Sequence, residues 1–282
     1  MKSAVEQAFA TAVSLPLFSR PAGWLADLRL PRPLLRAVIR AWTRAYGADL
    51  SEAAEPIEAF RTFNGFFTRA LRAGSRPVDP GPAVVVSPTD SRLSTLGPVP
   101  PDGRLAQVKG QGYSLDALLG STEEARPYAR GLHATLYLSP GMYHRVHAPV
   151  EGHILGWRYV PGRLFPVNPL AVRSVPGLFA RNERVVVHLE APGLGPVAVV
   201  LVGATNVGRI TLRFTELRTN AGAAAVRVTP REPIPIGRGD ELGVFNLGST
   251  VVLLVADATL VRASVSVGAL VRMGEALWRR PS

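Results

Sequence analysis

The stretch Glu241-Leu242-Gly243-Val244-Phe245-Asn246-Leu247-Gly248-Ser249-Thr250-Val251-Val252-Leu253-Leu254-Val255 contains two strand-like apolar runs joined by a glycine and a serine. Apolar runs of this length, bounded by turn residues, are typical of β-strands. A small hydroxyl residue that follows a glycine between two strands can attack its own backbone. Because the chain has no cysteine and its only lysines are Lys2 and Lys109, an electrophile made from serine would supply chemistry that the other side chains lack.

The same pattern of short apolar runs separated by turn residues extends over residues 76–282. Short apolar runs alternate with turns rich in proline and glycine, of which the chain has 25 and 27. The other predicted strands cover Ala83–Val86, Ala134–Leu138, Gly152–Val160, Arg184–Leu189, Val197–Val202, Arg209–Phe214 and Val261–Val267. We predict an antiparallel β-sandwich or barrel-sandwich-like catalytic domain, with a helical insertion over Ser114–Tyr128.

Residues 1–75 are predicted to be helical, which makes the fold class α+β and mainly β. The clearest helix covers Pro33–Tyr46, with apolar residues on one face and arginines on the opposite face. The pattern fits a surface helix packed on the core. It also fits an interfacial helix, with its apolar face in the acyl region of a membrane and its arginines on headgroups.

The chain is strongly basic, with a net charge of +11 and a pI near 11.0. Such a surface favours an anionic partner: nucleic acid, an anionic membrane or a substrate that carries phosphate. The apolar runs are too short to span a bilayer, which takes roughly 20 residues. We therefore expect a protein that is soluble or lies on a membrane without crossing it.

Two clusters of polar residues are candidates for chemistry. Tyr143-His144-Arg145-Val146-His147 carries two histidines, which can take and give protons near neutral pH. Ser87-Pro88-Thr89-Asp90 follows a predicted strand, and a carboxylate there could fix the tautomer of a histidine. A metal site at His144 and His147 is not supported, because acidic partners at ligand spacing are missing.

Eight motifs of this chain resemble, in order and spacing, those of bacterial phosphatidylserine decarboxylases. They are Phe66-Phe67-Thr68-Arg69, Arg76-Pro77, Ser87-Pro88-Thr89-Asp90, Tyr143-His144-Arg145-Val146-His147, the segments 162–168, 179–184 and 202–208, and Leu247-Gly248-Ser249-Thr250. The resemblance covers nearly the whole chain. One departure is Ser91, where the family usually has glycine, so the geometry of the turn after Asp90 is less certain.

The resemblance implies a proenzyme that cuts itself between Gly248 and Ser249. The Ser249 hydroxyl would attack the Gly248 carbonyl, with His147 as the base and Asp90 orienting it. Ser249 would become a covalent pyruvoyl group, the pyruvate cofactor of the family. A β subunit of residues 1–248 and an α subunit of residues 249–282 would stay together as a heterodimer, and a dimer of heterodimers is left open.

The resemblance also implies the reaction. The pyruvoyl ketone would form a Schiff base with the amine of phosphatidylserine and withdraw electrons as CO₂ leaves, and His144 would protonate the carbon to give phosphatidylethanolamine. Arg145, Arg163 and Arg209 are guesses for the residues that bind the phosphate. The expected location is peripheral, at the cytoplasmic face of the cell membrane, with an anionic phospholipid surface as partner.

Three other functions are compatible with parts of the sequence. The same pyruvoyl scaffold could act on a soluble amino-acid-like substrate, which the amphipathic helix argues against. The segments 147–154 and 236–243 look like the halves of a biotinyl or lipoyl carrier domain, but no modifiable lysine exists there. A nucleic-acid binder is permitted by charge alone, but no recognised module supports it, so nucleic acid is not expected as a partner.

Overall fold

The computed structural model describes residues 24–108, 111–205, 209–246 and 249–281. Most of the described chain is antiparallel β-sheet, as predicted, and none of the sheets closes into a barrel. The main sheet runs in the spatial order β11 (Val226–Val228), β7 (Gly152–Val160), β8 (Arg184–Ala191), β9 (Gly195–Val202), β14 (Ser249–Val255), β5 (Leu132–Leu138), β2 (Ser91–Pro98) and β16 (Leu270–Val271), with β12 (Ile234–Ile236) also on β7.

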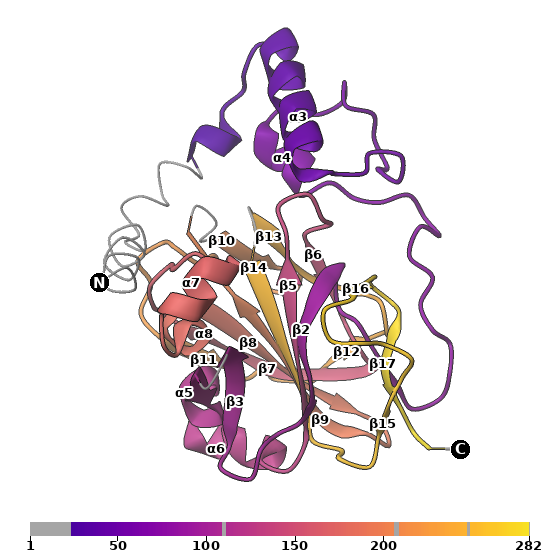
Figure 1. Cartoon of the computed structure of the whole chain (residues 1–282), viewed down its shortest axis with the longest axis vertical. Helices are drawn as coiled ribbons and strands as arrows, with labels where there is room; N and C mark the ends of the chain where they lie inside the picture. The colour runs from indigo at the N-terminus through magenta and orange to yellow at the C-terminus, as the bar shows by residue number, and fades with distance from the viewer. Residues whose placement is uncertain (1–23, 109–110, 206–208, 247–248, 282) are drawn as a thin grey trace.

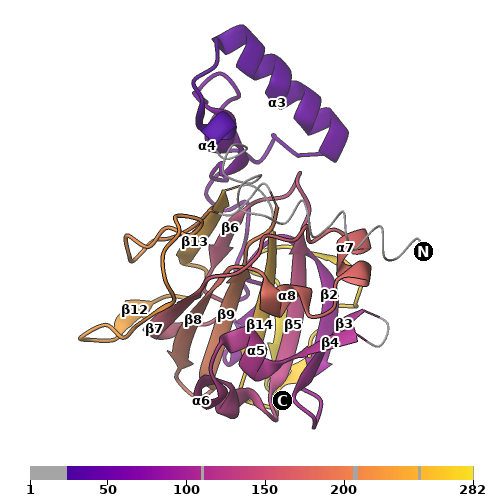
Figure 2. The same ribbon diagram turned by 90° about the vertical axis from the view of Figure 1, so that its left-hand side faces the viewer.

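Two three-stranded sheets cover one face of the main sheet, and short helices with a two-stranded sheet cover the other (Figures 1 and 2). The sheets are β10 (Arg209–Leu212), β13 (Glu241–Asn246) and β6 (Arg145–His147); β1 (Val84–Val86), β17 (Ala276–Arg279) and β15 (Val261–Arg262); and β3 (Arg104–Val108) with β4 (Gln111–Ser114). The helices of this part are α5 (Leu115–Leu119), α6 (Thr122–Ala125), the 3₁₀ turn η1 (Arg126–Tyr128), α7 (Pro169–Ser174) and α8 (Leu178–Arg181).

Strand β14 is apolar throughout because both of its faces are buried. Val251, Leu253 and Val255 pack into the core under the smaller sheets. Val252 and Leu254 pack into the second core, under α5–α8 and β3–β4. Because each face of β14 packs into an apolar layer, its sequence is continuously apolar and does not alternate between apolar and polar residues.

The N-terminal region lies above the end of the main sheet at which β13 ends and β14 begins (Figure 1). Its helices are a turn at 24–27, α3 (Arg32–Tyr46) and α4 (Phe63–Phe67). The predicted helix at Pro33–Tyr46 is present, and it ends at Gly47, whose φ of 64° is the left-handed C-cap conformation that glycine adopts without strain. Residues 48–62 and 68–75 are mostly irregular, so the prediction of a helical region is only partly met; residues 1–23 lie outside the described chain.

The predicted apolar face of α3 is split between two environments. Leu35 and Ile39 are buried against Phe66 of α4. Leu34 and Val38 on the neighbouring positions are 51% and 37% exposed. Packing on the domain therefore accounts for only half of the apolar pattern.

The other sequence predictions met mixed outcomes. The helical insertion is present as the three short pieces α5, α6 and η1. The two carrier-like segments pair with each other, through Ile236 opposite Gly152 and Glu241 opposite His147. The strand predicted over Val261–Val267 is wrong beyond Arg262, because the chain turns away after two residues.

Candidate functional site

The Gly-Ser junction lies where the chain passes from one sheet to another. Strand β13 ends at Asn246 in a small sheet, and β14 begins at Ser249 in the centre of the main sheet. Gly248 lies outside the described residues, and of Ser249 only the backbone is described, with Ser249 paired opposite Leu138 of β5. The junction is thus held on both sides by paired strands, which would keep two fragments together after a cut.

His144 is hydrogen-bonded to the end of β13 that leads into this junction. Its carbonyl accepts a hydrogen bond from the Phe245 amide at 3.0 Å, one residue before the end of β13. The Nδ1 atom of its ring lies 2.8 Å from the Met142 carbonyl, which can only accept, so Nδ1 carries the proton. The Nε2 atom then holds a free lone pair, and it is buried with no partner among the described residues.

Burial makes His144 a neutral imidazole. The side chain is fully buried and its ring packs at a tilt of 41° against Phe67 of α4, with 4.0 Å between the ring centroids. Loss of hydration lowers the pKa of His144 from 6.5 to about 3, and the positive charge of Arg69 acts in the same direction. The ring is therefore uncharged at neutral pH.

His147 lies further along β6, opposite Glu241 at the far end of β13. Its Nδ1 is 2.8 Å from the Gly239 carbonyl, and its Nε2 is 3.0 Å from the Tyr143 hydroxyl. Because the carbonyl fixes the proton on Nδ1, Tyr143 donates to Nε2. Burial lowers the pKa of His147 as well, and raises the pKa of Tyr143 to about 12, so the hydroxyl stays protonated.

Asp90 does not hold His147 through a hydrogen bond, contrary to the expected triad. Arg76 takes both carboxylate oxygens, from Nε to Oδ1 at 2.8 Å and from Nη2 to Oδ2 at 2.5 Å. The Met273 amide also donates to Oδ1, at 2.9 Å. A charged two-point pair is stronger than a bond to a neutral imidazole, which explains the choice of partner. The backbone of the Asp90 turn does contact His147, whose amide donates to the Pro88 carbonyl at 2.8 Å, and burial lowers the pKa of His147 more than the charge of Asp90 raises it.

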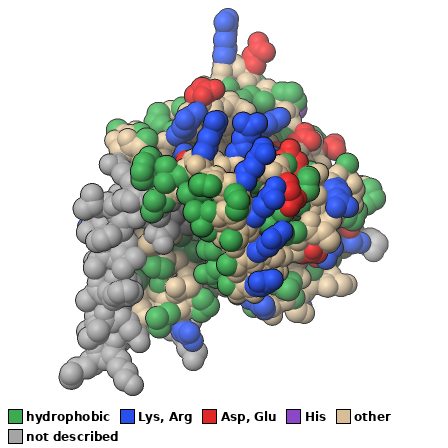
Figure 3. Space-filling view, turned by 90° about the horizontal axis from the view of Figure 1, so that it is seen from above, with side chains coloured by type: hydrophobic (Ala, Val, Ile, Leu, Met, Phe, Trp, Pro, Cys, Tyr) green, Lys and Arg blue, Asp and Glu red, His purple; other side chains and the backbone are tan. Residues whose placement is uncertain are grey.

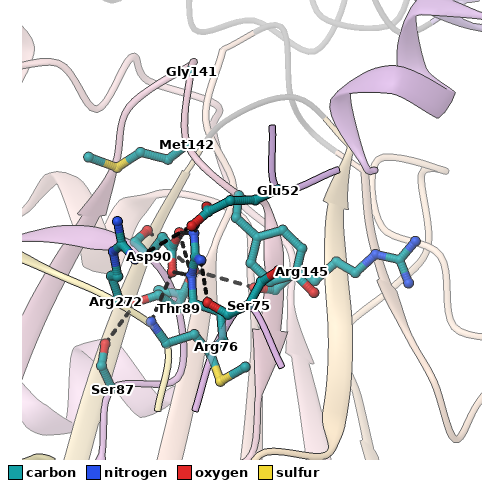
Figure 4. A network of polar contacts seen from close by, with 12 residues as sticks. Glu52, Ser75, Arg76, Ser87, Thr89, Asp90, Gly141, Met142, Arg145 and Arg272 are labelled. Atoms are coloured by element: carbon teal, nitrogen blue, oxygen red, sulfur yellow. Dashed lines mark hydrogen bonds and ion pairs between the residues drawn. The ribbon is translucent and has the colours of Figure 1, made fainter. Parts of the chain in front are cut away.

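Arg76 also connects Asp90 to the N-terminal region. Its Nη2 donates to Glu52 at 2.7 Å, so that Arg76 lies between two carboxylates (Figure 4). Only 8% of the Arg76 side chain is exposed. Neither Arg76 nor Tyr143 was singled out as a functional residue from the sequence, although both stand in motifs that carry the resemblance.

The three arginines guessed for phosphate binding lie in different places. Arg145 pairs with Glu241 at 2.7 Å and donates to the Thr68 carbonyl, so it fastens β6 to β13 and to the N-terminal region. Arg163 is exposed. Arg209 lies beside the junction, since its carbonyl accepts from the Asn246 side chain, but it is paired with Asp27 at 2.9 Å.

Three motifs of the resemblance converge beside the start of β14. The buried side-chain amide of Asn182 accepts from the Phe165 amide, and it donates to the carbonyls of Phe165 and Gly203, at 2.8 to 2.9 Å. Gly203 directly follows β9, whose last residue, Val202, pairs with Thr250. One asparagine therefore joins two loops at the edge of the junction; residues 206–208 lie outside the described chain.

Comparison with known proteins agrees with these features. Residues 63–279 match the family model described as phosphatidylserine decarboxylase. A phosphatidylserine decarboxylase proenzyme of Anaeromyxobacter sp. (strain K) is 48% identical over 266 residues, which cover 92% of each chain. The proenzyme of the same name from Bordetella avium (strain 197N) is 46% identical over 93% of this chain and 90% of its own. That of Myxococcus xanthus (strain DK1622) is 44% identical over 84% of each.

The fold and the site define a decarboxylase that is made as a precursor, in which a Gly-Ser bond joins two strands beside buried histidines. The chain belongs to the phosphatidylserine decarboxylase family.

Proposed function

We propose that this chain cleaves itself between Gly248 and Ser249 and then converts phosphatidylserine to phosphatidylethanolamine and CO₂. The observation that carries the proposal is the position of the junction. It links β13 to the central strand β14, and the buried His144, whose Nε2 has no partner in the described parts of the chain, lies beside the last residues of β13. Family membership supplies the substrate class.

The cleavage needs no outside reagent except water. The Ser249 hydroxyl oxygen forms a bond to the Gly248 carbonyl carbon, and the amide nitrogen leaves that carbon, so that the amide becomes an ester. Loss of the Ser249 Cα proton then breaks its Cβ–O bond. This step frees residues 1–248 with a carboxylate end and leaves dehydroalanine, whose hydrolysis expels ammonia and gives the pyruvoyl group.

In this proposal His147 accepts the serine proton. Its neutral tautomer, with Nδ1–H bound to Gly239, leaves Nε2 as the basic atom once it parts from Tyr143. We assign Asp90 a positioning role. Held by Arg76 and by the Met273 amide, it fixes the turn whose Pro88 carbonyl binds the His147 backbone.

The residues around the junction fit a pyruvoyl group. When present, such a group supplies a ketone that captures a primary amine and accepts the electron pair left by CO₂. The lone pair on His144 Nε2 provides an atom that can take a proton and return it to carbon. The buried Phe67 ring packs against the His144 ring, and the buried Phe245 donates its backbone amide to the His144 carbonyl, which supports exclusion of water from this side chain.

We further propose that the N-terminal region rests on an anionic membrane, so that the enzyme is peripheral. Among the described residues, no helix is long and apolar enough to cross a bilayer. Large apolar side chains are exposed at this end of the molecule, namely Trp24 (65%), Leu25 (56%), Leu34 (51%), Tyr46 (48%) and Val38 (37%). Figure 3 shows hydrophobic groups beside a row of basic side chains on this face. The cytoplasmic face stays a prediction.

Release of CO₂ tests the reaction and its substrate class together. Purified protein is supplied with carboxyl-labelled phosphatidylserine in vesicles, with water-soluble glycerophosphoserine, or with free serine. We expect labelled CO₂ and phosphatidylethanolamine from the vesicles and at least tenfold slower release from the soluble compounds. Equal rates on all three would favour a decarboxylase of soluble amino acids instead.

A further inference from the structure

A pocket of about 390 Å³ lies between the end of α3, the start of β2 and the loop from Ser139 to Tyr143. The same loop leads into His144, so the pocket and the candidate site share a wall. Its lining includes Arg69, Ser91, Arg92 and Arg272. Arg76, Asp90 and Tyr143 of the candidate site also line the pocket, but no function has been given above to the pocket itself.

Arg69 is a buried cation without an acidic partner among the described residues. Only 5% of it is exposed. Its guanidinium donates one hydrogen bond, to the Gly141 carbonyl at 3.1 Å, and lies over the Phe66 ring, while Nε has no partner. Burial lowers the pKa of Arg69. A buried guanidinium that lacks a carboxylate is costly unless an anion completes its surroundings.

Ser91 supplies a second donor in the same pocket. It is 1% exposed, and its hydroxyl has no hydrogen-bond partner among the described residues. Buried polar groups are normally satisfied, so an unsatisfied hydroxyl in a lining that also holds an unpaired guanidinium indicates a site for a ligand. Ser91 is also the position at which the chain departs from its family's usual glycine, so this hydroxyl is a feature of this chain.

The acidic residues at the pocket act on Arg69 only at a distance. Burial lowers the pKa of Arg69 more than the charges of Asp90, Asp49 and Glu52 raise it, and no ion pair joins any of them to Arg69 among the described residues. Glu52 and Asp90 both bind Arg76. Asp49, the third acid in the lining, is exposed and accepts from the Ser51 amide. The lining holds the four arginines 69, 76, 92 and 272 against these three carboxylates, so one positive charge is left over.

The mouth of the pocket is partly apolar. Tyr46 and Leu270 line it and are 48% and 61% exposed. Arg272, on the same rim, is 61% exposed. Tyr46 closes α3, the helix that carries the proposed membrane surface, so a ligand with an anionic end and an apolar end could enter from the bilayer.

We propose that this pocket binds the phosphodiester of a phospholipid headgroup, with Arg69 and Ser91 as the buried donors and the acyl chains at Tyr46 and Leu270. The planar guanidinium suits two-point recognition of a phosphate. That the phosphate belongs to a phospholipid is inferred from the function proposed above. That the pocket binds an anion is inferred from the pocket's own buried donors.

Calorimetric titration with glycerophosphoglycerol tests the site, because this diester has no amine and cannot react with a ketone. We expect saturable binding to the wild-type protein and to Ser249→Ala, so the result does not depend on self-cleavage. Arg69→Gln should weaken binding by about tenfold or more, as expected for loss of a charged hydrogen bond. Arg231→Gln, which removes an exposed arginine outside the pocket, is the matched control.

Ser91→Ala separates binding from folding. Because the hydroxyl is unsatisfied, its removal should leave the denaturation midpoint unchanged or higher, while binding weakens by about threefold. Diesters that bind Arg69→Gln and Ser91→Ala as tightly as the wild type would overturn the proposal, as would a diester that fails to bind at all.

Two further ligands identify the source of the anion. Dihexanoyl phosphatidylglycerol, used below its micelle concentration, should bind about tenfold more tightly than glycerophosphoglycerol, and Leu270→Ser should remove that gain. Inorganic phosphate should bind more weakly than either. If inorganic phosphate binds most tightly, the pocket takes free phosphate and the lipid assignment is wrong.

Discussion

Arg76 holds both carboxylate oxygens of Asp90, at 2.8 Å and 2.5 Å, and only 8% of its side chain and 13% of that of Asp90 are exposed. Through its bond to Glu52, the same guanidinium ties the N-terminal region to the turn that supports His147. The pair thus connects the proposed membrane surface to the proposed processing site.

Replacement of Arg76 should lower the free energy of unfolding more than replacement of Glu52, its more exposed partner. In a Ser249→Ala background, where the chain stays whole, Arg76→Gln should lower the free energy of unfolding by about 3 kcal/mol, because a buried carboxylate loses its partner. Glu52→Gln, at a more exposed carboxylate, should cost less than about 1 kcal/mol. Urea denaturation measures both.

A double-mutant cycle isolates the pair. Adding Asp90→Asn to Arg76→Gln should cost far less than the sum of the single changes, since the two residues interact directly. Strictly additive losses would mean that the contact contributes nothing to stability.

Replacement of His147 and replacement of His144 should block different steps, self-cleavage in the first case and decarboxylation in the second. His147→Ala should stay as one uncleaved chain, because the proposed base of self-cleavage is lost. His144→Ala should still mature but release CO₂ from phosphatidylserine at least a hundredfold more slowly, within the range expected for loss of a general acid or base. Gel electrophoresis reports cleavage and labelled CO₂ reports turnover. Because His144 lies nearer the junction, cleavage that is blocked in His144→Ala and normal in His147→Ala would reverse the assignment.

The buried His144 should make stability depend on pH in one direction. Its pKa is about 3 in the folded protein and 6.5 as the ordinary value, so between these limits the unfolded chain binds a proton that the folded chain does not. Stability should therefore fall as pH drops below 6.5 and should not respond to His144 above it.

Replacement of His144 isolates its share of this dependence, since burial also lowers the pKa of His133, His147 and His188. Between pH 6 and 5, Ser249→Ala with His144→Gln should lose less stability than Ser249→Ala alone, by about 1 kcal/mol per pH unit. Urea denaturation at several pH values tests this, and equal slopes for the two proteins would show that His144 is not kept neutral by the fold.

The exposed apolar residues of α3 should be needed for binding to membranes but not for folding. Leu34→Ser with Val38→Ser should reduce binding to anionic vesicles by about tenfold or more, because two apolar side chains no longer enter the acyl boundary. Self-cleavage in solution should continue. Leu155→Ser, at a residue on β7 that is 41% exposed, is the matched control. Vesicle co-sedimentation measures the effect, and equal binding of all three proteins would place the membrane surface elsewhere.

Much of the sheet could be predicted because its central strands are buried on both faces. Runs such as Val197–Val202 and Val251–Val255 have no polar residue to confuse the pattern, and each is a strand. Strand β2, Ser91–Pro98, is not among the predicted strands because its two leucines, Leu93 and Leu96, are three positions apart and a register shift between Leu93 and Thr95 interrupts the two-residue alternation. Its few apolar side chains did not stand out from a loop.

At the candidate site, the side-chain partners could not be predicted from the sequence. The sequence could place Asp90, His144 and His147 in motifs, but it could not show which partner each side chain would take. Arg76 is fourteen positions from Asp90, with strand β1 between them, and no turn or strand spacing in the sequence indicates that the two side chains meet. The unpaired state of Arg69 is likewise a property of packing, since it depends on which of the neighbouring acids other arginines occupy.

The intact masses of the purified wild-type protein and Ser249→Ala test the central claim most directly. The wild type should give two fragments, one ending at Gly248 and one covering residues 249–282, with the smaller lighter by one ammonia than a fragment that begins with serine. Ser249→Ala should give a single full-length mass. A wild-type protein that remains one chain while it releases CO₂ from phosphatidylserine would contradict the account.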